Sequence, residues 1–190
     1  MHKLLALPVA ATLGFAVSAH AADANHPDDF WTKVSVTASA LYQNSNFDKL
    51  SPKYMGYEFS AQYSPSDYLY ASVKAQHNYT GKWTYGVKVG AIYTTDVFSP
   101  YVEVGYDVSR GATHWNTDYD YDGGVFYTIP YHIIHGAAVF VEFDQFLTKR
   151  SYMTGGVKYQ LMPRVVVGAQ ASYNRHTLEK QGKASLTYTL

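Results

Sequence analysis

The segment 111–123, GATHWNTDYDYDG, is the one stretch whose residue types and spacing suggest ligand chemistry. It carries three carboxylates at alternate positions: Asp118, Asp120 and Asp122. Oxygen ligands at alternate positions followed by Gly123 match the first half of a calcium-binding loop. Ile129 occupies the position where such a loop needs a bidentate Glu, so the second half does not match. The favoured interpretation is a strand with Tyr119 and Tyr121 on one face and the three aspartates on the other.

Histidines provide a second candidate chemistry. His114 precedes the three aspartates, and a His beside carboxylates could act as a general base in hydrolysis. His132 and His135 are three residues apart, but no third metal ligand is evident, so they are better explained as turn or interface residues. We therefore predict no enzyme activity, no cofactor and no metal site. His114 and the three aspartates are kept as a weak loop candidate.

An alternating pattern indicates the elements that position these residues. In residues 83–93, WTYGVKVGAIY, every odd position is apolar or aromatic, and the even positions other than Ile92 are small or polar. A period of two predicts a strand with one apolar and one polar face. Aromatic residues at both ends of the apolar face, with aliphatic residues between them, are typical of a strand that crosses a bilayer in about 9–11 residues.

The same pattern recurs along the chain and predicts an all-β protein, a transmembrane antiparallel up-and-down β-barrel. The expected strands cover residues 31–42, 53–64, 68–79, 83–93, 100–110, 119–131, 137–147, 152–161, 165–174 and 182–190. An even number of strands suits a single-chain bacterial barrel. Links near residues 65, 96, 134 and 163 are then expected in the periplasm, and those near 47, 80, 115, 150 and 178 outside the cell. The alternatives are an eight-stranded barrel, in which elements within 119–148 merge, and a soluble β-sandwich.

The N-terminus predicts export. Residues 1–21 have the basic start, apolar core and small-residue ending of a secretory signal peptide, with cleavage expected after Ala21. Residues 22–29 form a short periplasmic lead, and residues 30–190 form the barrel. The formal net charge is zero, which gives no basic surface for nucleic acid, and the absence of Cys is compatible with an oxidising compartment. The expected location is the bacterial outer membrane.

The signal peptide, the alternating segments, the Tyr-rich strand ends and the alternating last strand, SLTYTL, together resemble the small outer-membrane β-barrels of Gram-negative bacteria. The resemblance is to the OmpA/OmpX-like and porin-like group, covers residues 30–190 and concerns the architecture of the barrel. It implies a monomer that is surrounded by outer-membrane lipid and lipopolysaccharide and inserted by the outer-membrane insertion machinery. Such chains usually end in Phe or Trp, whereas this one ends in Leu190. The paired acid/His sites of omptin proteases and the Ser/His/Glu arrangement of lipid A deacylases cannot be placed here.

Charged residues on the polar faces are expected to line the barrel interior. They are Lys33, Glu58, Lys74, Lys88, Glu103, Asp107, Glu142, Asp144, Lys158 and Lys183. Lysines and acids balance in this set, which predicts weak ion selectivity. Antiparallel pairing across hairpins predicts three ion pairs: Glu58 with Lys74, Lys88 with Glu103, and Glu142 with Lys158. Inward glycines are expected to leave some room: Gly56, Gly86, Gly90, Gly105, Gly156 and Gly168.

These inward residues allow two interpretations. The charge pairs and their waters could plug a narrow barrel, or they could line a small polar path. The predicted function is therefore an envelope structural role or a narrow, low-selectivity, porin-like passage for small solutes. The alternative is surface adhesion or host-factor binding through the extracellular loops.

Overall fold

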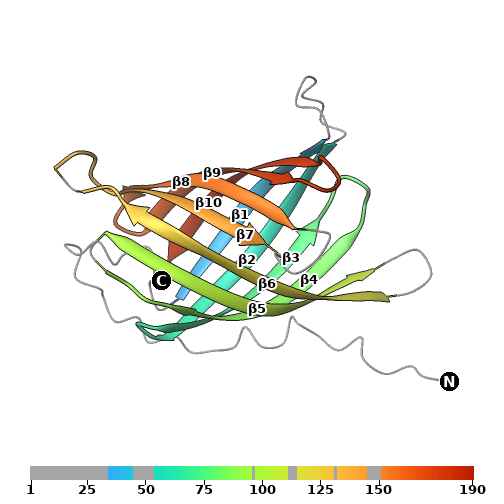
Figure 1. Cartoon of the computed structure of the whole chain (residues 1–190), viewed down its shortest axis with the longest axis horizontal. Helices are drawn as coiled ribbons and strands as arrows, with labels where there is room; N and C mark the ends of the chain where they lie inside the picture. The colour runs from blue at the N-terminus through green and yellow to red at the C-terminus, as the bar shows by residue number, and fades with distance from the viewer. Residues whose placement is uncertain (1–33, 45–53, 96, 111–114, 131, 145–150) are drawn as a thin grey trace.

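Ten antiparallel strands close into a single barrel (Figure 1). The computed structural model describes residues 34–44, 54–95, 97–110, 115–130, 132–144 and 151–190. The signal peptide, the lead segment 22–29 and Lys33 lie outside the described residues. The strand number and the closed barrel confirm the predicted fold class, and neither the eight-stranded barrel nor the soluble sandwich agrees with the structure.

The strands follow one another around the barrel in sequence order, and β10 pairs with β1 to close it. Their bounds are β1 Val34–Asn44, β2 Met55–Ser66, β3 Leu69–His77, β4 Trp83–Ile92, β5 Phe98–Arg110, β6 Trp115–Thr128, β7 Ala137–Asp144, β8 Tyr152–Met162, β9 Val165–Asn174 and β10 Lys180–Thr189. No helix among the described residues is long and apolar enough to span a membrane.

Strand β6 begins earlier than the expected residue 119. The pairing of β6 with β5 continues to Arg110, the last residue of β5, which lies opposite Trp115. Ladder hydrogen bonds therefore hold residues 115–118 in a strand although Asn and Asp have low strand propensity. Residues 115–123 are thus strand, and Asp118, Asp120 and Asp122 occupy alternate inward positions of it rather than an exposed loop.

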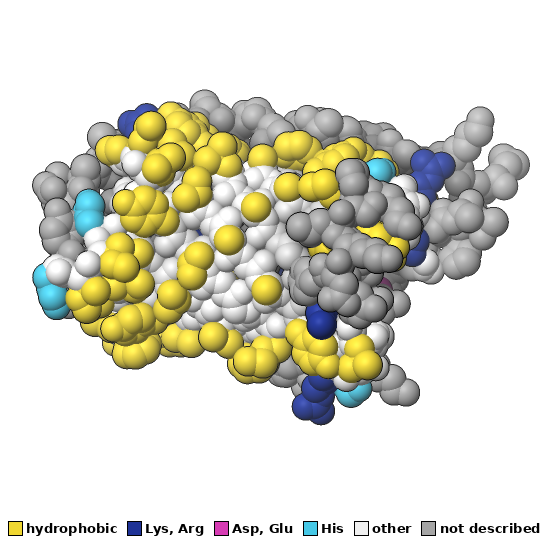
Figure 2. Space-filling view, turned by 90° about the horizontal axis from the view of Figure 1, so that it is seen from above, with side chains coloured by type: hydrophobic (Ala, Val, Ile, Leu, Met, Phe, Trp, Pro, Cys, Tyr) yellow, Lys and Arg dark blue, Asp and Glu magenta, His cyan; other side chains and the backbone are white. Residues whose placement is uncertain are grey.

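Alternation places apolar side chains on the outside of every strand, as the period of two predicts. Val87 on β4, Val102 on β5 and Leu186 on β10 are 52%, 63% and 52% exposed in the isolated chain. Figure 2 shows hydrophobic side chains spread over the barrel wall and Lys and Arg side chains gathered toward its ends. Such a surface fits contact with lipid hydrocarbon rather than with water, because soluble monomers rarely expose apolar patches of this extent.

The links fall at two opposite ends of the barrel. The described parts of the links from β2 to β3, β4 to β5, β6 to β7 and β8 to β9 lie at the left end in Figure 1, and links 78–82 and 175–179 lie at the right end. The chain enters β1 and leaves β10 at the left end, which the topology of single-chain bacterial barrels assigns to the periplasm. We call these the periplasmic end and the outer end.

Candidate functional site

Lys88 is the centre of the charged network inside the barrel. Its Nζ lies 2.8 Å from Glu103 Oε1 and 3.1 Å from Asp120 Oδ2, and it also contacts the carboxylate of Asp122. β4, β5 and β6 are consecutive strands, so one long side chain on β4 reaches carboxylates on both following strands. Asp122 is only 1% exposed, and a buried carboxylate of this kind needs a paired charge to stay ionised.

Lys74 on β3 extends the same network toward the outer end. Its Nζ lies 2.8 Å from Asp107 Oδ2 and 3.6 Å from Asp120 Oδ2. The predicted partner of Lys74 was Glu58, and the structure differs. Glu58 lies opposite Gln76, two residues from Lys74 on β3. The β2–β3 register also shifts near the turn, between Tyr63 and Ser66, so equal sequence distance from the turn does not give adjacency.

Glu58 instead pairs with Lys183, whose Nζ lies 2.8 Å from Glu58 Oε1. Glu58 is on β2 and Lys183 on β10, so this ion pair spans β1 and bridges the two ends of the folded chain. The contact exists only because the barrel closes. Sequence reasoning restricted to neighbouring strands missed it.

Glu142 and Lys158 were predicted to lie side by side across their hairpin, and the strand register does not place them so. Glu142 lies opposite Thr154, and Lys158 lies opposite Ala138, which places the two charges four residues apart along β8. Lys158 Nζ lies 4.6 Å from the centre of the Phe126 ring, in the range of a cation–π contact. Glu142 accepts a hydrogen bond from the Tyr101 hydroxyl.

The lumen carries more acids than lysines. Strand β6 adds Asp118, Asp120 and Asp122 to the inward set, so the described interior holds eight carboxylates and four lysines. The carboxylates are Glu58, Glu103, Asp107, Asp118, Asp120, Asp122, Glu142 and Asp144, and the lysines are Lys74, Lys88, Lys158 and Lys183. The expected balance of charge is therefore not found among the described residues, and the interior is acidic.

A cluster of inward apolar residues near the periplasmic end was not anticipated from the sequence. It consists of Tyr70, Ile92, Tyr101, Phe126 and Phe140. The Tyr70 hydroxyl donates to Glu103 Oε2 at 2.8 Å. The space that the inward glycines were predicted to leave is mostly filled by neighbouring side chains. A Cβ at Gly90 would meet Tyr70, one at Gly156 would meet Phe140, and one at Gly86 would meet Lys74.

A cavity of about 450 Å³ nevertheless lies in the lumen. Residues from the periplasmic ends of strands line it, such as Ser35, Gln62 and Thr187, and so do residues from the outer ends, such as Gln43, Gln76 and Gln181. Short hydroxyl and amide side chains of β9, β10, β1 and β2 form one wall, together with the Glu58–Lys183 ion pair, and we call this wall neutral because the pair carries no net charge. The charged side chains of β3–β8 form the other, since Lys74 and Lys88 lean onto their acidic neighbours.

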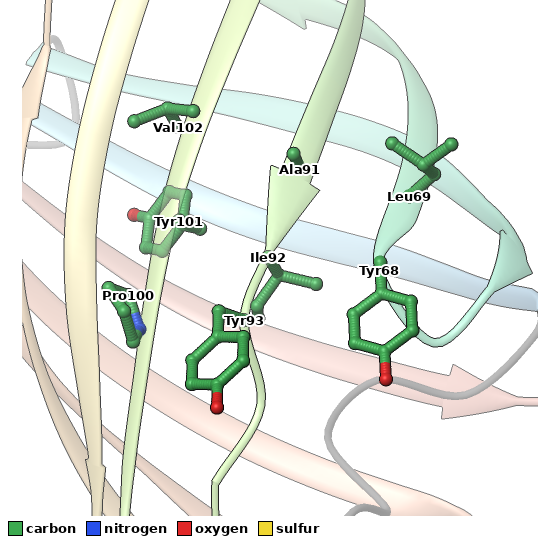
Figure 3. Close-up of a pocket in the computed structure, with 8 residues that line it drawn as sticks. All are labelled: Tyr68, Leu69, Ala91, Ile92, Tyr93, Pro100, Tyr101 and Val102. Carbon is green, nitrogen blue, oxygen red and sulfur yellow. The ribbon is translucent and has the colours of Figure 1, made fainter.

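A second depression lies on the outer surface near the periplasmic end (Figure 3). It has a volume of about 320 Å³ and is lined by Tyr68, Leu69, Ala91, Ile92, Tyr93, Pro100, Tyr101 and Val102. Leu69, Ala91 and Val102 are outward residues of the apolar band. No charged side chain lines this depression, so it offers contact area to hydrocarbon rather than a site for chemistry.

The remaining candidates do not assemble into a metal or catalytic site among the described residues. No group of three or more His, Asp or Glu there is arranged to hold a metal ion. The calcium-loop interpretation fails because the three aspartates are spread along an extended strand. His132 and His135 are exposed in the 129–136 link. His114 lies outside the described residues.

No protein-family model matches the chain, and no curated protein matches it significantly. Solved outer-membrane barrels are similar in structure. The Acinetobacter baumannii outer membrane protein Omp33 is 12% identical, with 84% of this chain and 98% of that one covered and a TM-score of 0.50. The KdgM porin is 11% identical, with 82% and 99% covered and a TM-score of 0.51. KdgM in complex with disordered oligogalacturonate gives a TM-score of 0.52 at the same identity and coverage.

The closed ten-stranded barrel, its apolar exterior and its polar lumen define the architecture of a small outer-membrane β-barrel. Within that class, the neighbour KdgM is a porin. The fold is thus porin-like, and the predicted resemblance is confirmed at that level.

Proposed function

We propose that the barrel is a narrow outer-membrane passage for small hydrophilic solutes that favours cations over anions. The cavity carries this proposal, because its lining joins residues from both ends of the strands and combines them with an excess of carboxylates. The sequence predicted weak ion selectivity, whereas this proposal gives the passage a preference for cations.

The path is expected to run along the neutral wall. Lys74 and Lys88 point toward carboxylates of β5 and β6, and Lys183 points toward Glu58. The contacts of Lys74 and Lys88 hold these long side chains against the charged wall. On the other wall the Glu58–Lys183 pair carries no net charge, and the short Ser, Thr and Gln side chains of β9, β10, β1 and β2 line the cavity beside it. Water and small solutes can exchange hydrogen bonds with such groups at little cost.

The charge of the interior favours cations. Rings of one charge sign in a pore attract the opposite ion, and low-dielectric walls strengthen the effect. KdgM was solved with an oligogalacturonate, a carboxylate-rich saccharide. The acidic interior described here disfavours such a polyanion, so we do not extend that ligand to this chain.

Reversal potentials of the purified protein in planar bilayers, measured under a KCl gradient, test the proposal. Discrete channels with a cation-selective reversal potential are expected. Gln170→Lys, on the neutral wall, should reduce the preference for cations, and Gln170→Glu should increase it, because both change charge at one position without removing an ion pair. A folded but silent barrel, or an anion-selective one, would overturn the proposal.

A further inference from the structure

Lys158 places its ammonium on two aromatic rings inside the barrel. Phe126 on β6 and Phe140 on β7 are direct cross-strand partners, with ring centres 5.2 Å apart and ring planes inclined by 32°. Lys158 Nζ lies 4.6 Å from the centre of the Phe126 ring and 5.7 Å from that of Phe140. Both distances are within the roughly 6 Å at which a ring face attracts a cation. We call Phe126 and Phe140 the ring platform.

Two carboxylates, Glu142 and Asp144, follow the ring platform along the inward face of β7. The Tyr101 hydroxyl donates a hydrogen bond to Glu142, and Thr154 Oγ1 donates one to Asp144 at 2.9 Å. These neutral hydroxyls hold the carboxylates in place without cancelling their charge. Glu142 also attracts the Lys158 ammonium electrostatically. The carboxylates therefore strengthen the attraction of the ring faces for a cation.

The ring platform is open to the lumen, because both rings, both carboxylates and Lys158 line the cavity. Lys158 is on β8, and β7 separates β8 from β6, so its side chain spans one strand to bring the ammonium over Phe126. The four-carbon stem of a lysine is flexible and can carry its charge away from the rings. The Phe140 ring lies over Gly156, whose partner on β9 is Gln170 of the neutral wall. The ring platform thus borders the wall along which solutes are expected to pass.

We propose that the ring platform and the two carboxylates form a subsite for organic ammonium ions, in which the Lys158 ammonium stands in for the solute. An amine would displace that ammonium, set its own charge over the rings and rest its hydrocarbon part on them. The hydrocarbon adds apolar contact that an inorganic cation lacks. As a statement about transported solutes, this inference rests on the passage proposed above and narrows it to amines. Binding to the ring platform is tested without it.

Chemical rescue of Lys158→Ala tests the subsite in detergent micelles. The probe is n-propylammonium, which reproduces the carbons and the charge that the substitution removes. It should raise the melting temperature of Lys158→Ala, and n-propanol, its neutral counterpart, should not. The wild type should show the same preference only at higher concentration, because its own ammonium competes with the probe.

A second substitution identifies the ring that the probe contacts. In Lys158→Ala/Phe126→Leu the apparent affinity for n-propylammonium should fall about two- to thirty-fold, the range expected for loss of a cation–π contact. Lys158→Ala/Phe98→Leu is the matched control, because Phe98 is an outward ring that is 54% exposed, and it should keep the affinity of Lys158→Ala.

The outcomes separate the subsite from the passage. Equal stabilisation by n-propanol, or equal affinity after Phe126→Leu, would overturn the subsite. If Lys158→Ala does not fold, the wild type alone decides, and the absence of any preference for n-propylammonium over n-propanol overturns the subsite. In planar bilayers, n-propylammonium should reduce the potassium current of the wild type. A silent barrel would overturn the passage alone, whereas a conducting barrel that n-propylammonium does not affect would overturn amines as its solutes.

Discussion

Tyr70 on β3 and Gly90 on β4 are direct cross-strand partners inside the barrel, and the Tyr70 ring lies over the glycine. A Cβ built at Gly90 would approach Tyr70 Cε1 to 2.7 Å, far inside van der Waals contact. The glycine thus provides a notch in the wall that the ring fills. The ring is folded against the strand rather than pointing across the lumen.

The same relationship recurs on the following strands. Tyr101 lies opposite Gly124, and Phe140 lies opposite Gly156, with the ring over the glycine in each case. Three large rings are accommodated in this way near the periplasmic end without filling the centre. We conclude that the inward glycines let the rings lie flat on the wall beside the lumen cavity.

Replacing Gly90 by Ala should therefore displace the Tyr70 ring into the lumen. The added methyl overpacks the notch, which costs about 1–3 kcal/mol in a well-packed interior. It also disturbs the hydrogen bond from the Tyr70 hydroxyl to Glu103. We expect a lower free energy of unfolding in urea and a lower single-channel conductance.

Gly155→Ala is the matched control for this prediction. Gly155 faces outward on β8, and the nearest atom to a Cβ added there is the Phe140 carbonyl oxygen at 3.9 Å. It should change neither quantity appreciably. A Gly90→Ala barrel with wild-type conductance would show that the ring position does not set the width of the path.

Lys88→Met should be strongly destabilising. The variant keeps the length of the side chain but leaves Glu103, Asp120 and Asp122 without the ammonium that they share. Removing one partner of a buried ion pair costs about 3–5 kcal/mol. Urea unfolding followed by tryptophan fluorescence measures this loss, and Asp122→Asn added to Lys88→Met should recover part of it.

Lys82→Met provides the comparison for Lys88→Met, because Lys82 lies in an outer turn. Surface substitutions of this kind change stability by about 0.5 kcal/mol or less. If Lys88→Met were no more destabilising than Lys82→Met, the Lys88 network would contribute little to folding.

The sequence predicted the direction of the side chains much better than their partners. A period of two decides which residues face inward, so the inward charges of β2–β10 were correct in position before any geometry was known. Partner choice depends on register, tilt and the reach of a lysine, none of which the alternation contains. This is why the predicted pair of Lys88 with Glu103 forms, while Glu58 pairs with Lys183 instead of Lys74 and Glu142 does not lie opposite Lys158.

The inward aromatic cluster could have been inferred in part. Tyr70, Tyr101 and Phe140 stand at inward positions, and each lies opposite an inward glycine once the hairpin register is set. Large residues facing small ones across a hairpin were the available signal. The signal peptide, the binding of insertion machinery, the monomeric state and the alternative of surface adhesion concern features that the described residues do not test, and they stay predictions.

The ion pair of Glu58 with Lys183 gives a test of the place where β10 pairs with β1 and closes the barrel. Reversing one charge, as Glu58→Lys or Lys183→Glu, places like charges together beside β1 and should destabilise the protein. The double reversal Glu58→Lys/Lys183→Glu should recover much of the loss, because the pair is restored with opposite polarity. Residues in contact commonly show coupling of about 0.5–3 kcal/mol in such cycles. Additive single effects would show that the two charges do not interact in the folded protein.

Closure between β1 and β10 can be tested by a disulfide. Ala40 and Ala184 are directly opposed outward residues of these strands, and the chain contains no Cys that could compete. Opposed residues of antiparallel strands have Cα atoms about 4.5–5.5 Å apart, which suits a disulfide. The variant Ala40→Cys/Ala184→Cys should therefore form an intramolecular disulfide in the folded barrel and migrate faster than its reduced form after heat denaturation in SDS. Ala40→Cys/Ala169→Cys is the control, because Ala169 pairs with Ala184 and lies two strands away from Ala40. Efficient oxidation of the control, or none of the opposed pair, would contradict the closed order of strands.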